Sequence, residues 1–177
     1  MLALLIGSFA LYLLVQVPGL QLMPKSSGNS SSKYTDFLMA PAMEALLNSI
    51  HELESSAGKN PKAYIEDKYG SYGEYRIRRN TYKDLQKAFP NKYGTKPFLV
   101  AMQDPVVARD AAKDYLGIIK NYLVQKNVKP SAGMLLASYN GGMGNAARGT
   151  LTSEALSYAN RGLEMTTKQL GVPFNAR

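Results

Sequence analysis

The sequence predicts a mainly helical fold with at most one small β-hairpin. Three stretches, 41–55, 105–129 and 152–170, carry apolar residues at the three-to-four-residue spacing of an amphipathic helix. Strand signals are weak and are confined to a tyrosine- and glycine-rich stretch around Tyr69 to Ile77. An apolar N-terminal segment precedes these elements, so we expect an N-terminal helix followed by a helical domain.

The first helix of the domain is expected over Pro41 to Ser55. Its apolar residues form one stripe, made of Met43, Leu46, Leu47, Ile50 and Leu53. A polar stretch, 56–80, follows this helix, and a short helix is expected over Thr81 to Ala88.

A longer helix is expected after Asp104, because Asp104 followed by Pro105 is typical of an N-cap and a first helical position. Lys129–Pro130 ends this segment. Its apolar stripe consists of Val107, Ala111, Tyr115, Ile118, Ile119 and Tyr122.

Ser131 is expected to cap a short apolar helix that runs to Tyr139. Residues 140–144 are predicted to be a loop, because three of the five are glycine. The last helix is expected over Thr152 to Leu170.

The N-terminal 24 residues contain no charged side chain. As a helix, Met1 to Val17 would be roughly 25 Å long, near the lower limit for crossing a bilayer. A retained membrane anchor, a cleaved signal peptide and a buried core helix all fit this pattern. Residues 25–33 are rich in serine and read as a flexible linker, so one domain is expected over 34–177.

Charge and composition limit the partners. The chain has 21 Lys and Arg against 13 Asp and Glu, a net charge of +8, which favours nucleic acid, anionic lipid or an acidic cell wall. The alternative is a solvated basic surface without a specific partner. No basic helix or known fingerprint supports a nucleic-acid partner. The absence of cysteine excludes disulfides, thiolate metal sites and cysteine nucleophiles.

Glu54 lies in line with the apolar stripe of the first helix. On a helical wheel it falls about 40° from Ile50, whereas Glu52 falls at about 200° and Glu44 near 120°. Burial and the negative end of the helix dipole both favour the protonated form of such a carboxyl group. A protonated carboxylic acid can donate to a glycosidic oxygen. The alternative is a glutamate at a fraying helix end that turns into solvent.

His51, the only histidine, falls on the flank of the same helix, at about 100°. With no second histidine and no cysteine, a metal site or a Ser-His-Asp triad has little support. No cofactor is therefore expected.

Three segments in order resemble motifs of lytic transglycosylases with the goose-lysozyme-like fold. Residues 54–63 are similar to the family's Glu-Ser and Asn-Pro-x-Ala segment, and residues 72–77 lie where the family has Gly-Leu-Met-Gln-Ile. Residues 136–144 resemble its Ala-x-Tyr-Asn-Ala-Gly-x-Gly signature. A weaker match, 158–161, resembles the tyrosine-bearing helix that closes the family's domain. The resemblance covers about residues 42 to 165.

The resemblance implies a lysozyme-like α+β domain that cleaves the bond between N-acetylmuramic acid and N-acetylglucosamine in peptidoglycan. Glu54 would act first as acid and then as base, while the sugar's own 6-hydroxyl attacks and gives a 1,6-anhydro product. Ser55 would position the substrate or Glu54, and Tyr139 and Asn140 would line the cleft. Tyr158 would approach the catalytic carboxyl group, although it lies off the Leu156/Leu163 stripe and an exposed tyrosine is the alternative.

The chain departs from the family pattern in 72–77. Arg76 stands where the family usually has glutamine, and Glu74 is an added carboxylate. The functional interpretation is an altered sugar contact by Arg76, or tuning of Glu54 by either residue. The alternative interpretation is a surface salt bridge of little energetic value.

Two further functions remain open on the same fold. A hydrolytic lysozyme would use Glu66, Asp67 or Glu74 to activate water. A non-catalytic, membrane-tethered module of a virion or secretion apparatus would need no catalytic acid. The expected partners are peptidoglycan strands and a membrane, with the domain facing the periplasm and cell wall or carried by a virion. Lys25 and Lys33 follow the apolar segment, and the positive-inside rule alone would place the domain in the cytoplasm.

Overall fold

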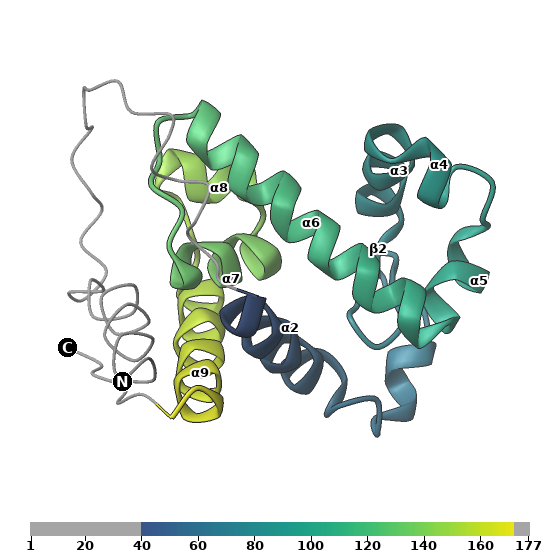
Figure 1. Cartoon of the computed structure of the whole chain (residues 1–177), viewed down its shortest axis with the longest axis horizontal. Helices are drawn as coiled ribbons and strands as arrows, with labels where there is room; N and C mark the ends of the chain where they lie inside the picture. Colours follow the sequence, from purple (N-terminus) through teal and green to yellow (C-terminus); the bar gives the residue numbers. More distant parts are fainter. Residues whose placement is uncertain (1–39, 172–177) are drawn as a thin grey trace, which may run out of the picture. The chain divides into compact units, whose positions relative to one another are not determined.

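A computed structural model describes residues 40–171 of the chain (Figure 1). Helix accounts for 71% of these residues and strand for 3%, which confirms the mainly helical fold with a small hairpin. The predicted N-terminal helix, the linker and the domain boundary near residue 34 lie outside the described residues. Within 40–171, no helix combines the length and apolar character that crossing a membrane requires.

The described chain divides into two compact units, and the division falls inside helices α2 and α6. The central unit comprises residues 50–118, and the terminal unit comprises 40–49 together with 119–171. The central unit contains the end of α2 (Ala40–Ser55), η1 (Pro61–Tyr64), β1 (Ser71–Tyr72), β2 (Ile77–Arg78), α3 (Arg79–Ala88), α4 (Pro90–Tyr93), α5 (Phe98–Gln103) and the start of α6 (Pro105–Gln125). The terminal unit contains the remainder of α2 and α6, with α7 (Ala132–Gly141), α8 (Met143–Arg148) and α9 (Ser153–Gln169).

Predicted helix starts are confirmed by their caps. The Asp104 carboxylate accepts hydrogen bonds from the backbone N–H groups of Val106 (2.9 Å) and Val107 (3.2 Å), and α6 begins at Pro105. The Ser131 hydroxyl caps α7, and the Thr152 hydroxyl caps α9. Each of these side chains satisfies a backbone donor that the first helical turn leaves free.

Helix α6 ends at Gln125, four residues before the stop predicted at Lys129–Pro130. Asn127 has a left-handed backbone, with φ of +57°. The Val128 N–H donates to the Leu123 carbonyl (2.9 Å), and the Asn127 N–H donates to the Val124 carbonyl (3.0 Å). This is the Schellman pattern, which asparagine tolerates, so the prediction missed a C-cap that lacks glycine.

The buried stripe of α6 also differs from the predicted one. Its buried residues are Ala108, Ala111, Ala112, Leu116, Ile119 and Leu123. Of the six predicted residues only Ala111 and Ile119 are buried, and the other four are half-buried. Alanines permit close packing, whereas the larger side chains of Tyr115 and Tyr122 remain half-buried.

Residues 140–144 were predicted to be a loop, and this is wrong. Helix α7 continues through Gly141, and α8 starts at Met143, so only Gly142, with φ of +87°, interrupts the helices. Gly141 is needed for packing, because a Cβ there would lie 2.7 Å from the Ala155 Cβ of α9. Helices α7 and α9 pack together in the terminal unit (Figure 1).

The hairpin of the central unit pairs β1 with β2 in antiparallel register, with Tyr72 opposite Ile77. Its turn begins at Gly73, whose φ is +81°. A Cβ at Gly73 would lie 2.4 Å from the Met102 carbonyl oxygen, so only glycine lets α5 pack this closely. Next to the turn, Tyr75 is buried, as are Tyr82 and Tyr93, so these three tyrosines belong to the core.

Candidate functional site

Glu54 lies in the last turn of α2, one turn after a fully buried stretch of the helix. Leu46, Leu47 and Ile50 are 0% exposed, and Glu54 itself is half-buried. The residue is therefore neither fully exposed to solvent nor enclosed in the core. This position is compatible with a group that exchanges a proton with a bound ligand.

A constrained turn fixes the end of α2 directly after Glu54. Ser55 is 1% exposed; its hydroxyl donates to the His51 carbonyl (3.0 Å) and accepts from the Gly58 N–H (2.9 Å). Ser56 and Ala57 both have φ of +52°, a left-handed conformation that costs a non-glycine residue on the order of 1 kcal/mol. Such strain often marks a functional segment.

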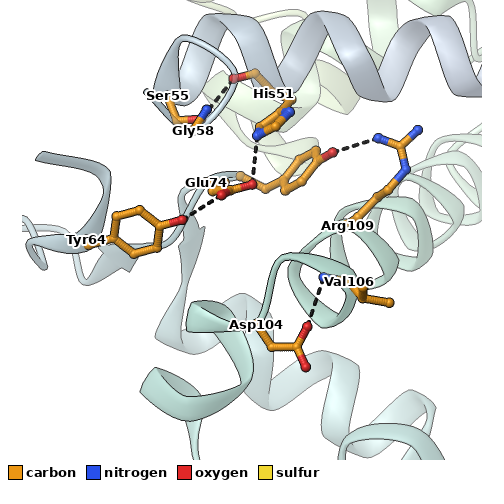
Figure 2. A network of polar contacts seen from close by, with 9 residues as sticks. His51, Ser55, Gly58, Tyr64, Glu74, Asp104, Val106 and Arg109 are labelled. Carbon is orange, nitrogen blue, oxygen red and sulfur yellow. Dashed lines mark hydrogen bonds and ion pairs between the residues drawn. The ribbon is translucent and has the colours of Figure 1, made fainter. Parts of the chain in front are cut away.

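The carboxylate of Glu74 is the centre of a polar network in the central unit (Figure 2). His51 Nε2 lies 2.8 Å from Glu74 Oε2, and the Tyr64 hydroxyl donates to Oε1 at 2.6 Å. Gly58 closes the other side, because a Cβ at Gly58 would lie 2.8 Å from Oε1. Glu74 is therefore held by groups from α2, from η1 and from the turn that follows Glu54.

The network continues from His51 to the start of α6. The His51 ring stacks on the Tyr75 ring with centroids 4.9 Å apart and planes 13° apart. The Tyr75 hydroxyl accepts a hydrogen bond from Arg109 Nη1 at 2.8 Å. The imidazole is thus fixed by a carboxylate at its edge and a ring at its face, on the turn of α2 that precedes Glu54.

The hydrogen bond to Glu74, together with burial, raises the pKa of Tyr64 to about 12. Tyr64 therefore keeps its proton at neutral pH and donates a hydrogen bond to Glu74. The Glu74 side chain is only 15% exposed, and its carboxylate contacts His51 Nε2 at 2.8 Å. The interpretation of Glu74 as a surface salt bridge is therefore wrong.

Arg76 holds together the loop in front of the hairpin. Its Nη1 donates to the carbonyl oxygens of Lys62 (3.2 Å), Ala63 (3.2 Å) and Ile65 (3.0 Å). Its Nη2 donates to Asp67 Oδ2 at 2.7 Å. Two of its three nitrogens thus serve the loop, and a sugar contact by Arg76 stays a prediction.

Glu66 and Asp67, the other two carboxylates proposed to activate water, are each paired with an arginine. Glu66 forms a bidentate pair with Arg79, and this hydrogen bonding lowers the pKa of Glu66. Burial acts to raise the pKa of Asp67, but hydrogen bonds from the backbone of Ser71 and Tyr69 and from Arg76 outweigh it, so the pKa is lowered. A lowered pKa makes both groups weaker bases.

The remaining predicted site residues lie in the terminal unit. Tyr139 and Asn140 are half-buried in the last turn of α7. Tyr158 is 4% exposed in α9, so the alternative of an exposed tyrosine is wrong. The central unit thus holds Glu54, Ser55 and Arg76, and the terminal unit holds Tyr139, Asn140 and Tyr158.

The sequence analysis did not predict that His51 and Tyr64 contact Glu74. Tyr64 carries no signal that separates it from the other tyrosines. His51 lies one turn before Glu54, which is the only local hint of a shared site.

Comparisons of the chain with protein families, with curated proteins and with solved structures find no match. Residues 40–171 contain no cluster of three or more histidine, aspartate or glutamate side chains that could hold a metal ion.

Proposed function

We propose that the protein is a peptidoglycan lytic transglycosylase with a lysozyme-like domain and Glu54 as its catalytic acid. The observation that carries the proposal is the position of the half-buried residue Glu54 between a fully buried helical turn and a constrained, left-handed turn. A carboxyl group in such a setting can be held in place while it gains and loses a proton.

The proposed reaction needs only one carboxyl group, that of Glu54, as both acid and base. Glu54 donates its proton to the oxygen that bridges N-acetylmuramic acid and N-acetylglucosamine, and the bond from that oxygen to the anomeric carbon breaks. The 6-hydroxyl oxygen of the muramic acid forms the new bond to the same carbon and returns its proton to Glu54. No second carboxylate is required, unlike in hydrolysis by two carboxyl groups.

The other predicted residues take supporting roles in this proposal. The Ser55 hydroxyl fixes the turn that follows Glu54. Tyr139, Asn140 and Tyr158 would contact the glycan, and Arg76 would contact the sugar. The N-terminal segment would hold the enzyme at a membrane, facing the cell wall, or the enzyme would travel with a virion or secretion apparatus.

A hydrolytic lysozyme is the second candidate, with Glu74 as the proposed base. Glu66 and Asp67 are paired with arginines that stabilise their ionised forms. Glu74 instead contacts His51 and Tyr64, so it is the carboxylate with a histidine partner. Water activation would therefore depend on Glu74, within the same unit as Glu54.

Digestion of purified sacculi by the full chain, with the products weighed, separates these functions. We expect products with 1,6-anhydro ends, one water lighter than products with reducing ends, and Glu74→Gln should leave this product type unchanged. Reducing ends that disappear in Glu74→Gln would establish hydrolysis instead. Intact sacculi after prolonged incubation with the wild-type chain would favour a non-catalytic module.

A further inference from the structure

The loop between η1 and β1 exposes two apolar side chains, and two cations lie close to the ring of one of them. Ile65 is 64% exposed and Tyr69 is 63% exposed. The Lys68 ammonium lies 4.9 Å from the centroid of the Tyr69 ring, and the Arg78 guanidinium lies 5.7 Å from it. We call Ile65, Lys68, Tyr69 and Arg78 the Tyr69 surface.

This exposure is built into a well-bonded loop. The Ile65 carbonyl accepts from Arg76, and the Ile65 N–H donates to the Lys62 carbonyl at 3.1 Å. The Asp67 carboxylate accepts from the Tyr69 N–H at 2.8 Å. The backbone is therefore fixed from beneath while both apolar side chains point away from the core.

The local acids are already neutralised. Glu66 pairs with Arg79, and Asp67 pairs with Arg76. Within residues 40–171, Lys68 and Arg78 form no ion pair with a carboxylate. Both cations are thus available to an external anion next to an exposed ring.

We propose that the Tyr69 surface docks onto an anionic lipid bilayer. Lys68 and Arg78 would meet phosphate groups of the lipid, while Tyr69 and Ile65 would enter the interfacial region. A tyrosine ring with its hydroxyl group suits this depth, where one end of the side chain is apolar and the other is wet. This inference does not depend on the proposed catalytic role of Glu54.

A bilayer fits this surface better than a wall polymer does. A glycan strand with peptide carboxylates would satisfy the two cations and could stack on Tyr69. It would leave Ile65 with nothing apolar to cover it. A bilayer satisfies the charges and buries both apolar side chains at once.

The chain contains no tryptophan, so Tyr69→Trp gives a single fluorescent reporter on this surface. The full chain is mixed with vesicles of phosphatidylcholine, or of phosphatidylcholine with phosphatidylglycerol. We expect the emission to shift to shorter wavelength, with protection from acrylamide quenching, on the anionic vesicles. A local reporter is needed because the apolar N-terminal segment could attach the chain to either vesicle.

When Lys68→Gln and Arg78→Gln are both added to the Tyr69→Trp variant, the ratio of inserted to free indole should fall about 30-fold. The reason is that each cation contributes binding free energy near an anionic surface. Ile65→Ser should reduce the emission shift, but the binding to anionic vesicles should still weaken when salt is added, because the cations remain. The matched control is Tyr122→Trp in the terminal unit. The ring of Tyr122 also has a cation near it, since the Lys126 ammonium lies 5.7 Å from its centroid, and the emission of this variant should not shift.

Three results would overturn the proposal. The first is an equal shift on neutral and anionic vesicles, which would remove the role of the cations. The second is a shift with soluble peptidoglycan fragments but not with vesicles, which would make the wall polymer the partner. The third is an equal shift for Tyr122→Trp, which would mean that the whole chain, and not this surface, enters the lipid.

Discussion

Gly58→Ala should destabilise the protein because it disturbs both the backbone and the Glu74 carboxylate. Gly58 has φ of +78°, and alanine in that region costs about 1 kcal/mol more than glycine. The new Cβ would lie 2.8 Å from Glu74 Oε1 and 3.1 Å from Cδ, so the carboxylate must move by a few tenths of an ångström. This movement weakens the bonds to Tyr64 and His51, at a further cost of about 1–2 kcal/mol.

The expected total loss is about 2–3 kcal/mol, which lowers the urea midpoint of unfolding by about 1 M. Gly70→Ala is the matched control. Gly70 has a similar φ of +74°, but its nearest neighbour, Glu66 Oε1, would be 3.4 Å from the Cβ, so only the backbone cost of about 1 kcal/mol applies. When Glu74→Ala is also present, the additional cost of Gly58→Ala should fall to the same backbone cost of about 1 kcal/mol. Equal midpoints for the two single variants would refute the packing of Gly58 against Glu74.

Three further predictions concern other parts of the chain. Asp67→Asn should cost about 1 kcal/mol at pH 7, because it removes the charge that pairs with Arg76. Since the folded pKa of Asp67 is lowered, this stability is present above the ordinary value of 3.8 and is lost as the pH falls through the folded value. The unfolding curves of wild type and variant should therefore converge at pH values below 3.8. Ser138→Ala should be neutral or should stabilise by up to about 1 kcal/mol in urea unfolding, because the buried Ser138 hydroxyl finds no hydrogen-bond partner among the described residues; a clear loss would reveal a partner. Gly141→Ala should cost about 1–2 kcal/mol through overlap with Ala155, and an unchanged thermal midpoint would contradict the close α7–α9 contact.

Features that depend on neighbouring residues were predictable from sequence. The caps at Asp104 and Ser131 were predicted because a cap and its backbone donors lie within three residues. The helix at 140–141 was missed because glycine is a poor helix former by itself. Its advantage, room for Ala155, appears only when two helices pack.

The polar network around Glu74 could not be predicted in the same way, because its residues are far apart in the sequence. His51 and Glu74 are 23 residues apart, and only the hairpin turn at Gly73 and the close fit of Gly58 bring them together. The short helices α4 and α5 were also missed, since four and six residues are too few to establish a period. The contacts of Arg76 with the carbonyl oxygens of its own loop were not predicted either, because they depend on how the loop folds back onto the hairpin.

The most direct test of the account is the rate at which Glu54→Gln releases soluble fragments from sacculi. The matched control is Glu52→Gln, which changes an exposed glutamate two residues earlier on the same helix. Loss of a general acid should lower the rate at least about 100-fold in Glu54→Gln, while Glu52→Gln keeps the wild-type rate. Wild-type release by a folded Glu54→Gln protein would contradict the assignment of Glu54 as the catalytic acid.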